Sequence, residues 1–299
     1  MITRRQFLAA SSCAALVGSL GSTRSFATGF KHPLGLQLFA VRAELAQDFA
    51  GTLARVASAG FSEIEFAGFH NKTASELKSI ADSNKLKCVS AHYGATDLES
   101  RSDEVLEFAT TLGVSHLVCS TPKSLSPDVN KLSWGARMHA LTLDDWKANA
   151  EIFNRFGEKA KRFNIQLAYH NYCVEFKPQG NVVPYYELLR LTDKNFVKIQ
   201  LDCGWAEVAG ASSLTLLNQY QDRVVSLHLK DLKTKPGSEA PESIPNVPIG
   251  QGVLDWPRIL RKAHNIGIKH YFLEQEPPYV EPIFDSLIAS ARYLSKVSF

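Results

Sequence analysis

Two short apolar runs of the sequence end in side chains that can hold a metal ion or move a proton. The first run is Val197–Asp202, and the second is Val224–Leu229, which carries His228 beside its last residue. One helix-length segment, Trp205–Tyr220, lies between them. In a parallel α/β protein this order brings the ends of neighbouring strands to one edge of the sheet. We therefore predict that Asp202 and His228 are ligands of one divalent metal ion.

Two further strand-end residues extend this set. Glu274 ends an aromatic run, where a carboxylate is costly to bury unless it is paired or metal-bound, and Glu276 competes with it by spacing. His170 ends another run, and strand alternation directs it to the same face as Ala168. Two imidazoles and two carboxylates suit Mn, Zn, Co or Fe better than Ca. We expect one divalent ion, for which Mg is also a candidate.

Strand-like apolar runs alternate with amphipathic helical stretches along the chain, and glycine follows several of these helices at the position of a left-handed C-cap. Eight strands, each followed by a helix, predict a (β/α)8 TIM barrel in a single domain over residues 28–299. An open doubly wound sheet is the alternative, but the glycine-rich phosphate turn that it needs after the first strand is missing. The expected strands are Leu34–Phe39, Glu63–Ala67, Lys87–His92, His116–Ser120, Ile165–His170, Val197–Asp202, Val224–Leu229 and His270–Glu274.

A barrel of this kind carries its chemistry at the C-terminal ends of its strands. Polar or ionisable residues recur at this place in otherwise unrelated runs, so we predict that they converge on one site. In chain order they are Gln37, Glu65, His92, Ser120, His170, Asp202, His228 and Glu274.

Short segments spread over residues 34–297 carry a resemblance to a known family. These segments are Gly35–Leu38, Ser90–Tyr93, Tyr169–Asn171 with Glu175–Phe176, Leu201–Trp205, Ser226–Asp231, Gly250–Gly252 with Asp255–Trp256, and Tyr271–Gln275. In them the sequence resembles the xylose isomerase-like TIM barrels, also called the sugar phosphate isomerase/epimerase family. The resemblance implies a metal-dependent enzyme acting on a small sugar-like molecule.

The resemblance also implies a ligand set. The family places its metal on a Glu, an Asp, a His and a Glu at strands five to eight, and the last three match Asp202, His228 and Glu274. Ala168 aligns with the first, which leaves His170, a loop residue such as Glu175, or a water for that ligand. Two of the family's carboxylates act as the acid/base pair in its epimerases, so this departure bears on epimerisation.

The chemistry implied is proton abstraction next to a carbonyl, with a metal stabilising the enediolate. Our catalytic candidates are Glu274 as base, with His92, His170 or Glu175 as the second acid or base. Lys230 can stabilise an oxyanion, and its alternative interpretation is a solvated lysine at a strand end.

Four residues are candidates for contacting a sugar. Gln37 and Glu65 can hydrogen-bond hydroxyl groups, and the alternative for Glu65 is a pairing within the barrel. Trp134 and Trp205 offer flat apolar faces on which sugar rings stack, although either also suits a core position.

The predicted function is a divalent-metal-dependent isomerase or epimerase that works through an enediolate on a sugar or keto-sugar. A lyase or hydratase on a 3-keto-sugar or keto-glycoside is the first alternative, because the same intermediate can lose water or a glycosidic leaving group. A non-catalytic sugar-binding barrel is the second. A nucleic-acid repair enzyme would need a three-metal ligand set and a basic face, and the sequence shows neither. A homo-oligomer is left open.

The first 27 residues differ from the rest of the chain. Arg4-Arg5 precedes an apolar stretch, Ala9–Leu20, that is too short to span a bilayer, and small residues follow up to Ala27. This pattern predicts a twin-arginine-like export signal cut after Ala27, and hence a periplasmic protein with no membrane contact after cleavage. Removing it takes the formal net charge from +3 to 0, which argues against a nucleic-acid partner.

Four cysteines lie beyond this signal, and no CxxC motif links them. Cys88 and Cys119 stand in apolar runs and are expected in the core. Cys173 and Cys203 follow strand ends, so a disulfide between them is an open alternative.

Overall fold

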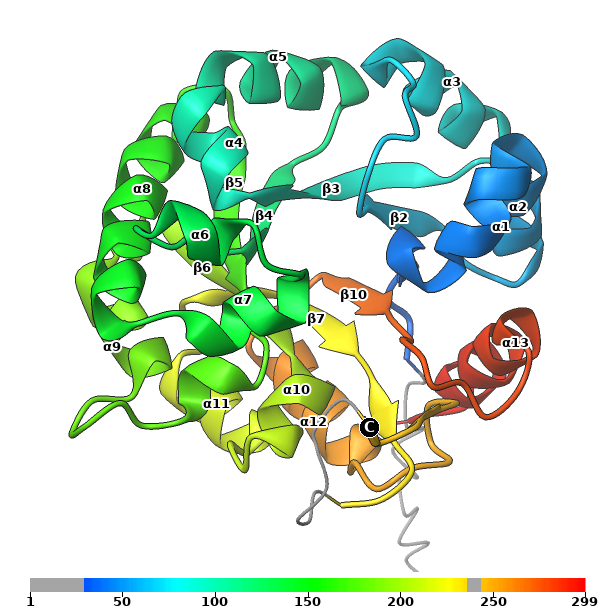
Figure 1. Ribbon diagram of the computed structural model, residues 1–299. Coiled ribbons are helices and arrows are strands. Elements are labelled where there is room, and N and C mark those ends of the chain that lie inside the picture. The colour runs from blue at the N-terminus through cyan, green and yellow to red at the C-terminus, as the bar shows by residue number, and fades with distance from the viewer. Residues whose placement is uncertain (1–29, 236–242, 299) are drawn as a thin grey trace, which may run out of the picture.

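The core of the computed structural model, which describes residues 30–235 and 243–298, is a closed barrel of eight parallel strands. The strand order is β1-β10-β7-β6-β5-β4-β3-β2, and Figure 1 shows the surrounding ring of helices. The predicted single-domain (β/α)8 barrel is confirmed. The barrel strands are β1 (Leu34–Gln37), β2 (Glu63–Phe66), β3 (Lys87–Gly94), β4 (His116–Thr121), β5 (Gln166–His170), β6 (Val197–Asp202), β7 (Val224–Leu229) and β10 (His270–Leu273).

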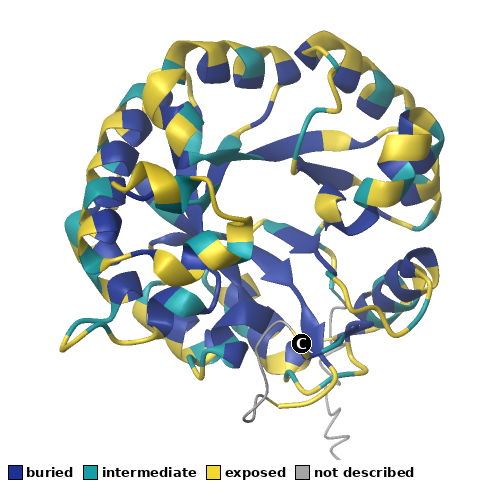
Figure 2. Ribbon diagram, in the orientation of Figure 1, coloured by how far each residue is buried: buried dark blue, intermediate teal, exposed yellow. Residues whose placement is uncertain are grey.

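The helices cover the barrel, and most of them bury one face against it, as Figure 2 shows by the dark inner and yellow outer sides of the ring. The strands are buried on both faces, as their apolar runs predict. The α-helices are α1 (Arg42–Gln47), α2 (Phe49–Ser58), α3 (Ala74–Ser83), α4 (Ala95–Ser100), α5 (Ser102–Leu112), α6 (Pro127–Asn130), α7 (Trp134–Ala140), α8 (Leu143–Lys161), α9 (Pro184–Leu191), α10 (Cys203–Val208), α11 (Ser213–Gln219), α12 (Trp256–Asn265) and α13 (Ile283–Leu294), with 3-10 turns η1 (Leu38–Val41) and η2 (Val174–Phe176).

Two local predictions need correction. The segment Trp205–Tyr220 is not one helix, because α10 and α11 are separated at Gly210, whose φ is +76°. The acidic pair Asp144–Asp145 before Trp146 predicts a helix cap, but helix α8 is capped earlier, by Thr142, whose hydroxyl and backbone exchange hydrogen bonds with Asp145. The predicted glycine C-cap is confirmed at Gly113, where φ is +82°.

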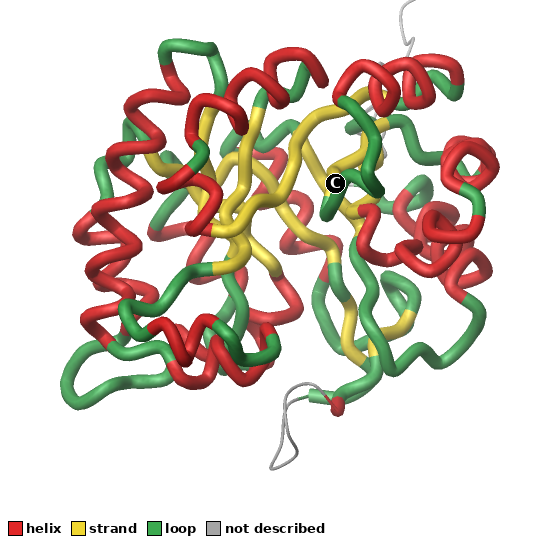
Figure 3. The backbone as a smooth tube through the Cα atoms, turned by 45° about the horizontal axis from the view of Figure 1, so that its top comes forward, coloured by secondary structure: helices red, strands yellow, loops and turns green. Residues whose placement is uncertain are grey.

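The long connection after β7 carries a small hairpin, in which β8 (Asp231–Leu232) pairs with β9 (Asn246–Val247). Figure 3 shows the barrel strands enclosed by helices and loops. None of the described helices is long and apolar enough to cross a membrane. The predicted export signal, residues 1–27, lies outside the described residues.

Candidate metal centre and active site

The ends of four neighbouring strands bring together His170, Asp202, His228 and Glu274. Each side chain offers one ligand atom, and these atoms all lie within 4.8 Å of one another. All four residues are buried. The register aligns them, because Asp202 on β6 pairs directly with His228 on β7. The four residues predicted as metal ligands therefore form one cluster.

Strand β5 supplies His170 to this cluster, so of the three alternatives that Ala168 leaves open for this position, the structure brings His170 to the other three residues. Ala168 lies opposite Val118 of β4 and Lys198 of β6. His170 comes two residues later on β5 and lies opposite Gln200 of β6. Side chains two residues apart share a face but stand roughly 6.6 Å apart along the strand. Only His170 reaches the level of the other three ligands.

The donor set fits a divalent metal ion. Asp202 Oδ1 accepts the backbone N–H of Trp205 at 2.7 Å and so caps α10, whereas Oδ2 is buried and forms an ion pair with Lys230, whose Nζ lies 3.2 Å away. His228 Nδ1 lies 3.0 Å from Glu274 Oε2 and 3.9 Å from Asp202 Oδ2. Carboxylate oxygens beside imidazole nitrogens form a mixed nitrogen and oxygen environment that suits Zn or Mn.

The protonation of the two ligand histidines is set by their neighbours. Burial, together with His228 and His92, holds the pKa of His170 well below its usual value, so this imidazole is neutral. Burial alone would also lower the pKa of His228, but Glu65 and Glu274 raise it to about 10. These two carboxylates therefore favour a positive charge on the His228 ring itself.

Glu65 lies beneath the cluster, at the centre of the barrel. Its Oε1 accepts hydrogen bonds from Gln37 Nε2 at 2.8 Å and lies 2.6 Å from His228 Nε2, while Oε2 accepts from Gln200 Nε2 at 2.6 Å and from Ser90 Oγ. The side chain is fully buried and does not line the pocket. The prediction that Glu65 binds substrate is corrected, because its carboxylate is used within the barrel and orients His228.

Lys230 is buried rather than solvated. Its Nζ lies 3.2 Å from both Asp202 Oδ2 and Glu274 Oε2 and 2.5 Å from Glu276 Oε1. Burial opposes its charge, but these three carboxylates raise the pKa of Lys230 above its usual value. Gly204 permits this placement, because a Cβ there would stand 2.8 Å from Lys230 Cγ.

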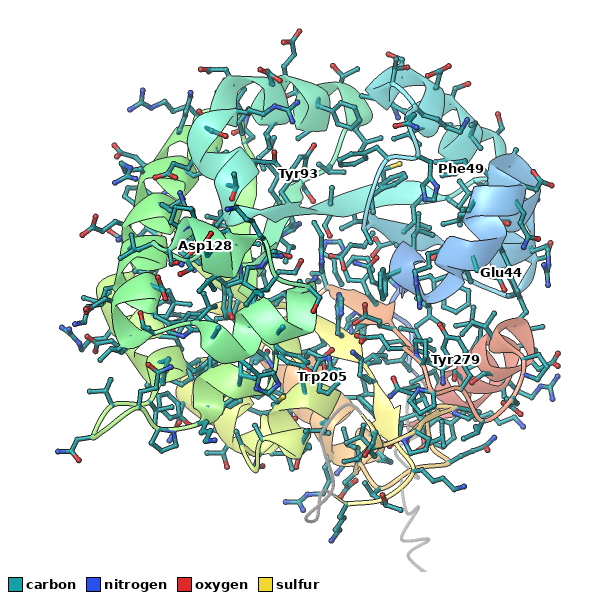
Figure 4. All side chains as sticks on the ribbon, viewed as in Figure 1. Glu44, Phe49, Tyr93, Asp128, Trp205 and Tyr279 are labelled. Carbon is teal, nitrogen blue, oxygen red and sulfur yellow. The ribbon has the colours of Figure 1, made fainter. Side chains whose placement is uncertain are left out.

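A pocket of about 320 Å³ opens above the cluster. Its walls include predicted substrate residues Gln37, Trp134 and Trp205, together with His170 and Glu274 from the cluster. Figure 4 shows Trp205 beside the end of β7, and the Lys230 ammonium lies 4.6 Å from the Trp205 ring centroid.

His92 reaches the same pocket from β3. Its Nε2 lies 2.9 Å from Glu65 Oε1 and 2.9 Å from Gln200 Oε1, and these contacts leave Nδ1 for a substrate. The carboxylates of the pocket, Glu274 and Glu276, gather around Lys230, whereas His92 and His170 form the other wall. The pocket thus has one carboxylate side and one imidazole side.

Glu175 lies behind β5 and not in the pocket. Its Oε1 accepts hydrogen bonds from Tyr169 OH and the Tyr172 backbone N–H, both at 2.7 Å. The Tyr169 ring packs against Trp146 and Phe153 of α8, in the helix layer. This geometry does not support the catalytic role predicted for Glu175.

Sequence reasoning missed Gln200 and Ser90, which hold Glu65, and the alternative that Glu276 takes the place of Glu274 in the cluster is wrong. Gln200 and Ser90 each stand two residues before a predicted site residue, so strand alternation was a signal that could have found them. Glu276 pairs with Lys230 instead of joining the ligand cluster. Cys203 is a free thiol, so the alternative disulfide with Cys173 is wrong.

Comparison with known proteins places these observations in a family. The pattern of the family described as xylose isomerase-like TIM barrel matches residues 53–297. An inosose dehydratase of Clostridium perfringens is 25% identical over 274 residues, which cover 83% of this chain and 89% of that protein. A crystal structure described as a sugar phosphate isomerase/epimerase from Parabacteroides distasonis is 26% identical, has a TM-score of 0.71, and is matched over 91% of this chain and 96% of that chain. A structure described as IOLI protein with a binding zinc atom has a TM-score of 0.67 at 14% identity, over 89% of this chain and 99% of that one, and shows the fold alone.

Replacing Asp202 with Asn should weaken metal binding without unfolding α10. The amide oxygen can still cap the helix at Trp205, but the anionic oxygen Oδ2 is lost. At an ion concentration of about 100 times the wild-type Kd, Zn²⁺ or Mn²⁺ should stabilise the metal-stripped wild type by about 2.7 kcal/mol. If the variant binds about 100-fold more weakly, the gain falls to about 0.4 kcal/mol.

Urea unfolding with and without the ion measures this difference. Glu63→Gln is the matched control, because Glu63 is a buried carboxylate that contacts His270 at the far end of the barrel. An equal ion-induced gain in Asp202→Asn and the wild type would contradict the proposed ligand set.

Replacing Glu175 with Gln should change the pH dependence of stability and leave any turnover intact. Burial raises the pKa of Glu175 from 4.5 to about 7, so the folded state binds more protons than the unfolded state between these values. The free energy of unfolding of the wild type therefore falls as pH rises through this window, by up to about 3 kcal/mol. The variant lacks this loss.

Urea titrations from pH 4.5 to 7.5 compare the two proteins, with exposed Glu158→Gln as control. A catalytic Glu175 would instead show a loss of turnover of about 10²-fold or more in the variant.

Proposed function

The chain belongs to the xylose isomerase-like TIM barrel family, and from this premise we propose that it is a metal-dependent lyase that eliminates a leaving group from a keto-sugar or keto-cyclitol. The observation that carries the proposal is the cluster of His170, Asp202, His228 and Glu274 at the floor of a pocket with distinct carboxylate and imidazole sides. The 25% identity to an inosose dehydratase, over most of both chains, supports the lyase alternative over the isomerase that sequence reasoning put first.

The residues divide the work of an elimination. A divalent ion held by the cluster would polarise the substrate carbonyl and stabilise the negative charge that follows loss of the neighbouring proton. Burial opposes the charge of Glu274, but Lys230 and His228 hold its pKa well below the usual range, so it is ionised and able to accept that proton. Lys230 is held by three carboxylates and keeps a fixed positive charge beside the base.

His92 is the proposed acid for the leaving group. It stands on the imidazole side of the pocket, and Glu65 fixes its Nε2. Trp134 is exposed at the pocket and offers an apolar face to a sugar ring, whereas Trp205 lies buried in the pocket wall beneath the Lys230 ammonium. A proton thus leaves toward a carboxylate and is delivered from an imidazole, which suits the removal of a hydroxyl from the neighbouring carbon.

An isomerase or epimerase is the second candidate, and the 26% identity to the Parabacteroides structure favours it. Epimerisation by paired carboxylates needs one on each face of the substrate. The pocket carboxylates Glu274 and Glu276 both contact Lys230, and Glu65 is used beneath the floor. This one-sided arrangement supports the lyase.

The products formed in deuterated water should separate the two reactions. With a keto-inositol or a 3-keto-sugar, a lyase yields an unsaturated ketone that has lost one water, seen by mass and ultraviolet absorbance. His92→Asn should lower kcat by about 10²- to 10⁴-fold, because the amide carries no transferable proton. His116→Asn, at the opposite end of the barrel, is the control.

A deuterated product with an unchanged carbon and oxygen skeleton would instead support the isomerase. The absence of turnover with any keto-sugar, combined with tight sugar binding, would support the non-catalytic binding barrel.

Export to the periplasm is a separate part of the proposal, supported by the order of charged, apolar and small residues in the first 27 positions. Protein purified from the periplasm should begin at Thr28 by N-terminal sequencing. A Lys-Lys replacement of Arg4-Arg5 should keep it in the cytoplasm, and a full-length chain in wild-type cells would contradict the predicted cleavage.

A further inference from the structure

A second hollow lies beside the active pocket, with a volume of about 660 Å³. The two cavities share Ala67, His92, Ser120 and Thr121, at the ends of β2, β3 and β4. In the barrel order β3 lies across from β7, so the hollow opens on the opposite side of the active pocket from Lys230. A ligand seated on the cluster can therefore extend past His92 into this space.

The wall of the hollow is aromatic. The Phe69 ring centroid lies 5.3 Å from that of Tyr93 and 4.5 Å from that of Phe108, and all three side chains are half-buried. Figure 4 shows Tyr93 between β3 and α5. Partly exposed ring faces of this kind stack on another ring with an apolar face, either a sugar or an aryl group.

The charges of the hollow balance. Arg101 lies 3.4 Å from Asp97 and 2.8 Å from Glu104, and these pairs sit with Lys72 at the lining. Two basic and two acidic side chains leave no net charge to attract a phosphate or a carboxylate. The hollow therefore favours a neutral ring.

His92 stands where the two cavities meet. A leaving group protonated there would have its oxygen at the junction and its remaining atoms in the hollow. Water, the leaving group of a dehydratase, would use none of this space.

From this arrangement we infer that the substrate is a keto-glycoside, with its keto-sugar ring in the active pocket and a neutral ring-bearing leaving group in the hollow. The inference rests on the proposed lyase function and names the leaving group. The C–H bond beside the ketone breaks and its proton passes to Glu274. The electron pair forms the C=C bond, the bond to the glycosidic oxygen breaks, and that oxygen takes a proton from His92. The products are an unsaturated keto-sugar and a free alcohol or phenol, and no oxidant is needed.

Three 3-keto-glucosides test the inference on the wild-type enzyme. One carries a phenyl group, one a second glucose and one only a methyl group at the glycosidic oxygen. We expect kcat/KM for at least one ring-bearing compound to exceed that for the methyl glycoside by about tenfold, as one or two ring contacts predict. The phenyl and glucosyl arms distinguish an aryl from a sugar leaving group.

Two variants locate the effect in the hollow. Phe108→Ala should lower kcat/KM for the preferred ring-bearing compound by about 2- to 10-fold and leave the methyl glycoside unchanged. Gly68→Phe should likewise lower kcat/KM for the ring-bearing compound alone, because its ring would fill the hollow. The position has room for a side chain, since a Cβ at Gly68 meets nothing within 4 Å. Phe163→Ala, at an exposed phenylalanine outside the lining, is the matched control.

Equal kcat/KM for the three glycosides, or equal losses on all of them in both variants, would overturn the inference. Loss of water from a free keto-sugar without cleavage of any keto-glycoside would also overturn it, but would leave the proposed lyase standing. The absence of elimination from every keto compound would remove the proposed function itself. If Phe108→Ala fails to fold, Gly68→Phe and the wild-type comparison still decide the matter.

Discussion

A single buried carboxylate, that of Glu65, holds the interior of the barrel together. It interacts with side chains from β1, β3, β6 and β7, so strands far apart in the chain meet at one pair of oxygen atoms. Burial would raise the pKa of this carboxyl, but His92 and His228 hold it well below the usual range. An ionised group at this depth is tolerable only because all of these donors are in place. The histidines of the site are consequently oriented before any substrate arrives.

Above Glu65, positively and negatively charged side chains alternate in the site. His228 lies between Glu65 and Glu274, with one ring nitrogen toward each carboxylate. Lys230 occupies the neighbouring corner with Asp202 and Glu276. Negative groups therefore outnumber the fixed positive ones along this side of the pocket, which is the electrostatic reason that a divalent cation fits there. The imidazole side is left to exchange protons with a substrate.

The sequence was sufficient to predict the barrel, because apolar runs buried on both faces mark strands regardless of tertiary detail. Val197–Asp202 and Val224–Leu229 have the predicted bounds, and the strand-end rule named all four residues that cluster in the structure. The position of a side chain along the barrel axis was harder to predict than the face of the strand on which it lies. Alternation places Ala168 and His170 on the same face but does not say which lies level with Asp202, because that depends on the stagger between strands.

The remaining errors share a physical cause. Glu65 and Glu175 are both carboxylates near strand ends, and the sequence does not show which hydrogen-bond donors converge on them. In the structure Glu65 is bound by partners from 25 to 163 positions away in the chain, whereas Glu175 turns back to Tyr169 only six positions before it. A local pattern such as Glu-Phe after a strand cannot distinguish these outcomes. The same limit applies to Gln200, whose importance comes from reaching Glu65 across 135 positions.

The barrel also separates what decides the type of reaction from what decides the substrate. The ends of β5, β6, β7 and β10 provide the ligand cluster, and the ends of β2, β3 and β4 provide the wall shared with the second hollow. Among the described residues of that shared wall, His92 is the one that also contacts Glu65. Phe69 follows β2 and Tyr93 lies at the end of β3, and their ring contacts are with each other, Phe66 and Phe108. These side chains can therefore change without loss of a ring contact to the cluster. A family built on this division can keep one proton-abstracting centre and vary the group that leaves, because the acid stands at the boundary between the two halves.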